Sequence, residues 1–143
     1  MIVFAVAGCR PAAKGPELTF YVQLVRGTDA EAPPTQASRP VGHELSRRLN
    51  CAFRWKHYWE MEQHAVVVPV GQTVVDRLSS ERSVQIQLLD SSQMAVRVCS
   101  TGGAVRCRRQ PVTNAFCVAG GNLGGGQSWF VVVRHDKPQT GSD

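Results

Sequence analysis

The sequence predicts a mainly β fold, an antiparallel sandwich or small barrel with one helix after the first strand. From residue 53 onward, apolar and polar residues alternate with period two, which is the spacing of a half-buried strand. Turn signals recur there at intervals of about 8–12 residues, as they do in all-β sandwiches. Earlier in the chain, apolar residues at four-residue spacing follow Pro40 and predict the single helix.

The chain has the size and composition of one globular domain. Its 143 residues are 43% hydrophobic and 19% charged. A disordered chain lacks that share of apolar residues, and no run of ~20 apolar residues marks a membrane span. We expect a truncated lipoprotein signal over residues 1–9, a tether over 10–17, one β-rich domain over 18–135 and a polar tail over 136–143.

The first strand and the helix have different sequence signals. Residues 18–25 are rich in β-branched and aromatic side chains and predict a strand. Val41, Leu45 and Leu49 predict the helix, and Phe53 is next in their series. Further strands are expected over residues 53–61, 64–70, 73–78, 83–89, 94–99, 104–109, 116–119 and 128–134.

Two of these strands alternate cleanly. In one, Val84, Ile86 and Leu88 are expected to point inward and Gln85 and Gln87 outward. In the next, the expected inward residues are Met94, Val96 and Val98.

The glycine-rich segment 120–126 has neither the G-x-G-x-x-G spacing of a dinucleotide loop nor the lysine of a P-loop. It predicts a hairpin connection.

The start of the chain carries a short motif. Val6-Ala7-Gly8-Cys9 resembles the lipobox of bacterial lipoproteins, in which small residues precede a cysteine that becomes acylated. The resemblance implies lipidation of Cys9. No cationic segment precedes the short apolar stretch, so a buried first strand is the alternative.

Without Cys9, four cysteines remain, which are Cys51, Cys99, Cys107 and Cys117. If residues 105–109 and 115–119 form a hairpin, Cys107 lies opposite Cys117 at a Cα separation that suits a disulfide. Cys51–Cys99 then follows by elimination. Four reduced, half-buried thiols are the alternative.

Positive charge is concentrated in two segments, residues 39–56 and the stretch between Asp90 and Asp136. The net charge is +5, and no acidic residue lies between Asp90 and Asp136. Such basic segments attract polyanions, although a solvated arginine-rich surface is the alternative.

The predicted hairpin of residues 94–99 and 104–109 places arginines opposite each other. In a hairpin where Cys99 faces Ala104, Arg97 faces Arg106, and Arg108 lies on the same side. Directly opposed like charges cost a few tenths to about 1 kcal/mol. Water and counterions, nearby acids such as Asp76 or Asp90, or an anionic partner must offset that cost. We therefore expect Arg97→Thr to stabilise the free domain.

Residues 53–60 interleave aromatic and cationic side chains. On a strand, Phe53, Trp55, His57 and Trp59 share one face, a pattern that suits stacking on bases or sugar rings. Packing of this face into the core is the alternative. The opposite face then offers a contact strip, and the complete predicted anion-binding set is Arg54, Lys56, Tyr58, Arg97, Arg106 and Arg108.

No catalytic or metal motif is present. The sequence lacks G-x-S-x-G, H-E-x-x-H and C-x2-C, so we predict no catalytic residue, no metal ligand and no cofactor. A thiol- or metal-dependent enzyme, with His57 or His64 as a base for a cysteine nucleophile, is a further alternative.

Three segments carry a family resemblance, and they are 20–28, 53–58 and 128–133. In this order they resemble a group of small, uncharacterised exported bacterial proteins rich in β-structure. The resemblance implies an exported, periplasmic or membrane-anchored location. The expected function is a non-catalytic binding or structural module of the bacterial envelope, with a basic surface for an anionic protein or glycan. The alternative is a module that binds single-stranded nucleic acid.

Overall fold

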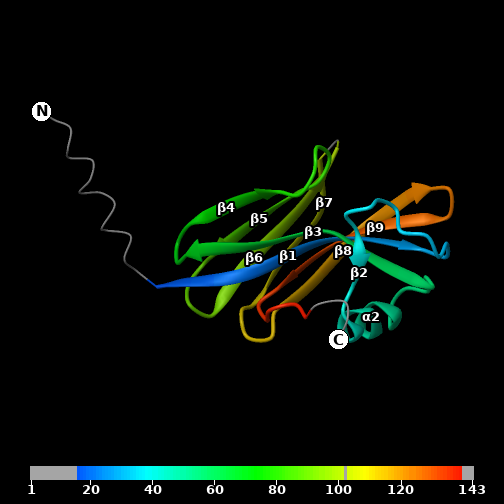
Figure 1. Cartoon of the computed structure of the whole chain (residues 1–143). Coiled ribbons are helices and arrows are strands. Elements are labelled where there is room, and N and C mark those ends of the chain that lie inside the picture. The colour runs from blue at the N-terminus through cyan, green and yellow to red at the C-terminus, as the bar shows by residue number, and fades with distance from the viewer. Residues whose placement is uncertain (1–15, 102, 140–143) are drawn as a thin grey trace, which may run out of the picture.

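The computed structural model describes residues 16–101 and 103–139, and it confirms the mainly β prediction. Two antiparallel sheets, of five and four strands, pack face to face (Figure 1). They form a sandwich rather than a closed barrel. The predicted signal, Cys9 and most of the predicted tether lie outside the described residues.

The five-stranded sheet has the order β2-β3-β1-β9-β8. Its strands are β1 (Glu17–Thr28), β2 (Arg39–Pro40), β3 (His57–Pro69), β8 (Phe116–Gly124) and β9 (Gln127–Arg134). The predicted strand 18–25 lies within β1, and the predicted hairpin around 120–126 joins β8 to β9. Gly124, Gly125 and Gly126 all have positive φ at this turn, where other residues are strained.

The four-stranded sheet has the simple order β4-β5-β6-β7. Its strands are β4 (Thr73–Arg77), β5 (Ser83–Leu88), β6 (Gln93–Ser100) and β7 (Gly103–Pro111). In Figure 1 this sheet lies on the left, while the β8–β9 hairpin extends to the right.

The main core lies between the sheets. Val84, Ile86 and Leu88 point into it from β5, and the inward residues of β6 are also those that the alternation predicted. Phe20 and Val22 meet them from β1.

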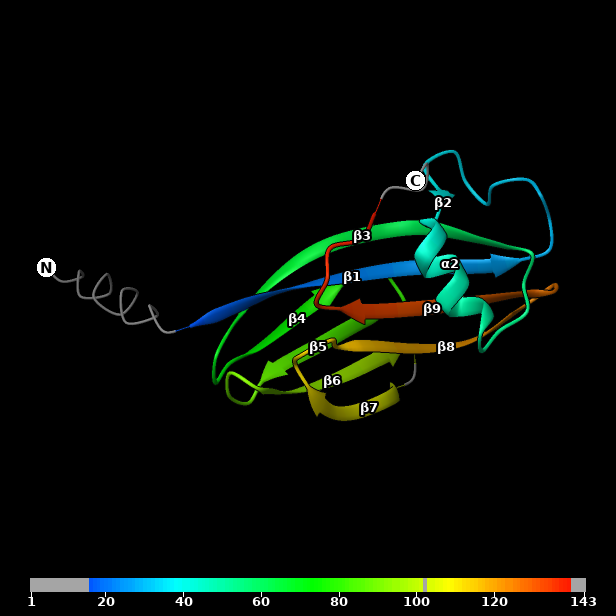
Figure 2. The ribbon, with the colours of Figure 1, turned by 90° about the horizontal axis from the view of Figure 1, so that it is seen from below.

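The predicted helix forms as α2 (His43–Asn50) and packs on the opposite face of the five-stranded sheet. Leu45 and Leu49 are 3% and 1% exposed and contact a second apolar cluster that includes Phe130. Figure 2 shows α2 lying across β1 and β9 on the face away from the four-stranded sheet. The described part of the chain has no helix with the length and apolar character of a membrane span.

The predicted strands 53–61 and 64–70 are one strand, β3, which begins only at His57. A register shift leaves Met61 as an extra residue, since Leu24 pairs with Glu62 and Val25 with Glu60. This β-bulge reverses the alternation along β3, so residues on either side of Met61 change face.

Buried polar side chains hold β1, β2 and β3 together beside α2. Oε2 of Glu60 accepts hydrogen bonds from Nε2 of Gln23 at 2.8 Å and from Nε2 of Gln63 at 2.7 Å. Oε1 of Glu60 pairs with Nη2 of Arg39 at 3.1 Å. The buried carboxylate of Glu60 is therefore satisfied by three donors, as a buried charge requires.

Candidate anion-binding face

The outer face of the four-stranded sheet gathers the side chains that alternate with the core residues. Register places Gln85 of β5 between Val75 of β4 and Arg97 of β6. The next register line across the sheet joins Thr73, Gln87, Ala95 and Arg109. We call the set Arg77, Arg97, Arg109, Gln85, Gln87 and Thr73 the arginine face.

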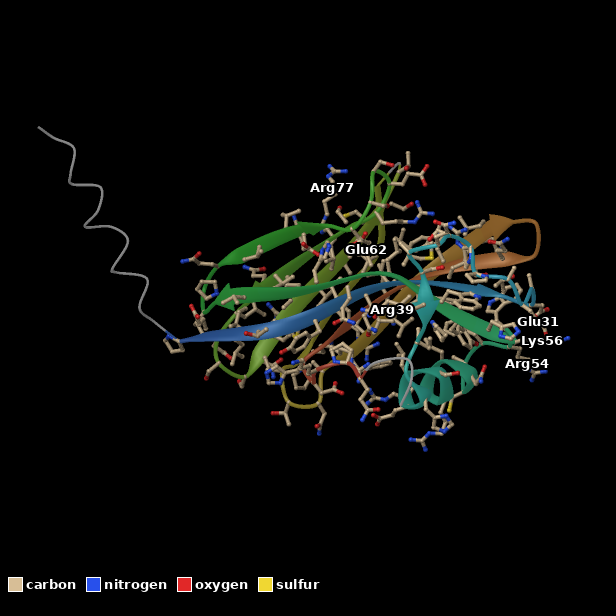
Figure 3. The ribbon with its side chains drawn as sticks, in the orientation of Figure 1. Glu31, Arg39, Arg54, Lys56, Glu62 and Arg77 are labelled. Carbon is tan, nitrogen blue, oxygen red and sulfur yellow. The ribbon has the colours of Figure 1, made fainter. Side chains whose placement is uncertain are left out.

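Part of the arginine face is concave. A shallow cavity of about 320 Å³ is lined by both glutamines, Thr73, Arg97 and Arg109. Arg77 lies on the same side of β4 as Thr73 and points into solvent (Figure 3). Diagonal neighbours on adjacent strands have Cβ atoms about 7–8 Å apart. Arg97 and Arg109 therefore lie close enough to contact one polyanion together.

Among the described residues, the outward positions of β4–β7 include no Asp or Glu. Asp76 points to the other side of β4 and contacts His64. Asp90 accepts hydrogen bonds from its own turn, at Ser92 and Gln93. Asp76 and Asp90, which were one alternative for offsetting the arginine charges, therefore do not contact the arginine face.

The predicted opposition of Arg97 and Arg106 is wrong. A register shift between Val98 and Cys99 makes Arg106 the partner of Val98, and Arg97 the partner of Cys107. Cys99 still faces Ala104, as expected, but the β-bulge moves every later residue of β7 to the other face. The shift separates two like charges that would otherwise lie directly opposite each other.

Arg106 and Arg108 instead lie on the inner side of edge strand β7, opposite Val98 and Val96. There they are close to Cys117 of β8. Burial raises the pKa of the Cys117 thiol, and the two guanidinium groups oppose that shift. Arg106 therefore does not contribute to the arginine face, whereas Arg108 is exposed and also lines the cavity on that face.

The predicted strip of Arg54, Lys56 and Tyr58 is only partly correct. Arg54 and Lys56 are exposed at the far end of the molecule, near Glu31 (Figure 3). Tyr58 is 4% exposed, and its hydroxyl donates to Oδ1 of Asn50 at 2.9 Å. Burial raises the pKa of Tyr58. Residues 57–60 do alternate, but Tyr58 and Glu60 are on the buried side and His57 and Trp59 are half-buried, so Tyr58 belongs to the core under α2.

Trp55 and Trp59 occupy different environments. Trp55 packs against the second apolar cluster, which supports the core alternative for this residue. Trp59 is half-buried, and its ring centroid lies 6.2 Å from that of His57. The four predicted rings therefore do not form one continuous stacking surface.

His64 forms a polar bridge between the sheets. Its Nδ1 lies 2.8 Å from Oδ2 of Asp76 on β4, and its Nε2 lies 3.2 Å from Oε1 of Glu62. The hydrogen bond to Asp76 raises the pKa of His64, with a smaller contribution from Glu62. A protonated His64 satisfies both carboxylates, so this cluster stabilises the β3–β4 contact.

The hairpin that predicted a Cys107–Cys117 disulfide does not form. β7 and β8 belong to different sheets, with Cys107 on the outer face of one and Cys117 inside the sandwich. Cys51 follows α2, on the opposite side of the molecule from Cys99 on β6. All four are free thiols in the structure.

Sequence reasoning missed Arg77 and Arg109. The period-two pattern did place Gln85 and Gln87 outward, and extending it across neighbouring strands also gives Arg77. Arg109 requires the bulge in the β6–β7 pairing, for which the sequence has no recognisable signal.

Metal chemistry has no support in the described residues, which contain no group of three or more His, Cys, Asp or Glu placed to hold an ion. Comparison with known proteins finds no matching family model, no matching curated protein and no matching solved structure.

Proposed function

We propose that this protein is a non-catalytic binding or structural module of the bacterial cell envelope, and that its arginine face holds an anionic partner. The observation that carries the proposal is the presence of three outward arginines on a partly concave sheet face, at which the described part of the chain places no carboxylate. Uncompensated cations on one surface attract an anion over a distance set by the ionic strength.

The side chains between the arginines favour an acidic glycan over a purely ionic partner. Gln85 and Gln87 offer amide donors and acceptors, and Thr73 adds a hydroxyl. Sugar hydroxyls need both donors and acceptors, whereas the guanidinium groups bind carboxylate or sulfate in bidentate geometry.

Binding to polygalacturonate, a carboxylated glycan, tests the proposal at several salt concentrations. The double variant Arg97→Gln/Arg109→Gln removes two charges from the arginine face. The matched control Arg54→Gln/Lys56→Gln removes two charges from the opposite end of the folded molecule. We expect the first variant to lose about tenfold or more in affinity, equivalent to about 1.4 kcal/mol, and the control to bind as the wild type does.

Two further polymers distinguish the alternatives. Polyglutamate that binds more tightly than the glycan would identify an acidic protein segment as the partner. Single-stranded DNA that binds most tightly would support the nucleic-acid alternative. Equal losses in the two double variants would overturn the proposal, because net charge alone would then explain the binding.

The proposed envelope location is tested by separate experiments. Mass spectrometry of the native protein is expected to find an acyl adduct on Cys9, and cell fractionation is expected to recover the protein with the envelope. Recovery from the cytosol without an adduct would overturn this part of the proposal and leave the arginine face to be tested separately.

A further inference from the structure

A second, larger cavity opens where the four-stranded sheet ends. The five-stranded sheet is longer, so the far part of its inner face is covered by turns and loops instead of by strands. The cavity measures about 490 Å³ and lies between the β4–β5 turn, the loop before β2 and the β8–β9 hairpin. This volume is within the range of small-molecule sites.

One part of the cavity wall is aliphatic. Leu24 and Met61 come from the five-stranded sheet, Leu78 from the β4–β5 turn and Leu123 from the β8–β9 hairpin. Leu123 is 39% exposed. Half of the lining residues are polar or charged. Met61 reaches the cavity at the bulge of β3, the one place where that strand has an extra residue.

The guanidinium group of Arg82 is a buried cation that packs against the ring of Trp129. The Cζ atom of Arg82 lies 4.2 Å from the centroid of the Trp129 ring, and Arg82 is only 8% exposed. Its Nη1 pairs with Oε1 of Glu81 at 3.1 Å, but the Glu81 side chain is 63% exposed. The Nε atom of Arg82 is buried without a hydrogen-bond partner among the described residues. Burial of this charge is therefore incompletely compensated by the protein.

The other charged side chains that line the cavity are Glu81 and Glu62, which have ionic partners, and Arg26, which has none among the described residues. Both carboxylates are paired, Glu81 with Arg82 and Glu62 with His64. Arg26 donates only a long hydrogen bond of 3.5 Å, from Nη1 to Oε1 of Gln127, and forms no ion pair within the described residues. The unmatched groups at the cavity are thus cationic donors.

We propose that this cavity binds a small monocarboxylate with an aliphatic chain, such as a medium-chain fatty acid. The carboxylate lies beside the guanidinium groups of Arg26 and Arg82, where a negative charge lowers the cost of burying Arg82. The chain lies against Leu24, Leu78 and Leu123, where it loses contact with water. This site is separate from the arginine face and does not depend on the function proposed for it.

Isothermal titration of the full chain with octanoate tests the proposal. Two matched ligands separate the contributions of the carboxylate and of the aliphatic chain to the affinity. 1-Octanol lacks the carboxylate, and butyrate lacks most of the chain. Octanoate is expected to bind saturably and more tightly than either. Failure of octanoate to bind, or equal affinity for octanol, would overturn the proposal.

Variants locate the site. Arg26→Gln is expected to weaken octanoate about tenfold, the loss of one charge-assisted hydrogen bond, and to leave octanol unchanged. Leu123→Ser is expected to weaken both ligands and to leave the protein folded, because the Leu123 side chain is 39% exposed. The control Arg109→Gln removes an arginine that does not line the cavity and is expected to leave octanoate binding unchanged.

If Arg26→Gln and Leu123→Ser bind octanoate as the wild type does, the cavity is not the binding site and the proposal fails. Arg97→Gln/Arg109→Gln separates this result from the function proposed above. That variant is expected to keep its affinity for octanoate while it loses the glycan.

Discussion

At the scale of single residues, Glu60 is the side chain on which the most buried polar groups depend. Replacing it with leucine leaves Gln23 and Gln63 without their acceptor and removes the ion pair with Arg39. Unmet buried donors cost about 1–3 kcal/mol each, while the exposed Arg39 returns to water. We expect Glu60→Leu to lower the free energy of unfolding by about 2–3 kcal/mol in urea denaturation. An unchanged midpoint would show that the three donors find other partners.

His64 makes stability depend on pH. Its pKa in the folded protein is raised above the ordinary value of 6.5, chiefly by Asp76. The folded state therefore holds the proton more tightly than the unfolded state does. The stabilisation is complete below about pH 6.5 and is lost as the pH rises through the raised folded value.

The free energy of unfolding, measured in urea at about pH 6 and about pH 8, tests this contribution. The wild type is expected to lose more stability over that interval than His64→Gln does. Equal losses in the two proteins would assign the pH dependence to other groups.

Arg97 shows how a residue's neighbours decide the effect of its substitution. The sequence-based expectation was that Arg97→Thr relieves repulsion from Arg106, but these residues lie on different faces. Because Arg97 is exposed and pairs with Cys107, we now expect Arg97→Thr to change the free energy of unfolding by less than about 0.5 kcal/mol. A gain near 1 kcal/mol would indicate repulsion from Arg109 on the same face.

At the scale of elements, local periodicity was sufficient for most strands and for α2. Residues 83–89 and 94–99 alternate without interruption, and their pairing is regular over the same residues. The helix was recognisable because Leu45 and Leu49 both face the second cluster. In each of these elements the buried residues recur at a fixed interval along the sequence, and a search for periodicity detects such an interval.

Two of the β-bulges, at Met61 and between Val98 and Cys99, could not be predicted in the same way. Met61 and the shift between Val98 and Cys99 each reverse the face of the residues that follow. A bulge depends on pairing with a neighbouring strand, so a single strand's sequence does not carry it. The bulge between Val98 and Cys99 changed the faces of Arg106 and Arg108. Tyr58 has a different cause, because residues 57–60 alternate regularly and the side of β3 that carries Tyr58 is the buried one.

The contact between β1 and the segment before β3 requires glycine at position 27. A Cβ atom there would lie 2.5 Å from Cδ1 of Trp55 and 2.9 Å from Cε2 of Phe130. We expect Gly27→Ala to displace Trp55 and to cost about 1–3 kcal/mol, the usual cost of overpacking. Thermal unfolding and the tryptophan fluorescence maximum measure the two effects. Gly71→Ala is a control for steric contact, since no atom lies within 4 Å of a Cβ there, although its positive φ adds strain.

At the scale of the whole molecule, the sandwich separates the two surfaces for which we propose ligands. The arginine face lies outside the four-stranded sheet, whereas the cavity proposed to bind a monocarboxylate lies beyond its end, on the inner face of the longer sheet. The second apolar cluster and α2 occupy the third side. This separation is why the variants proposed for one surface serve as controls for the other.

The same arrangement sorts the thiols by accessibility. Cys51 and Cys107 are exposed on opposite outer sides, whereas Cys117 is buried between the sheets and burial raises its pKa. An alkylating reagent attacks the thiolate, so both burial and the raised pKa slow its reaction. We expect iodoacetamide to label Cys51 and Cys107 quickly in the folded protein, and Cys117 only after denaturation, as read by peptide mapping. Recovery of a peptide with Cys107 linked to Cys117 would contradict the strand arrangement itself, because the sandwich places those two side chains on different sides of its four-stranded sheet.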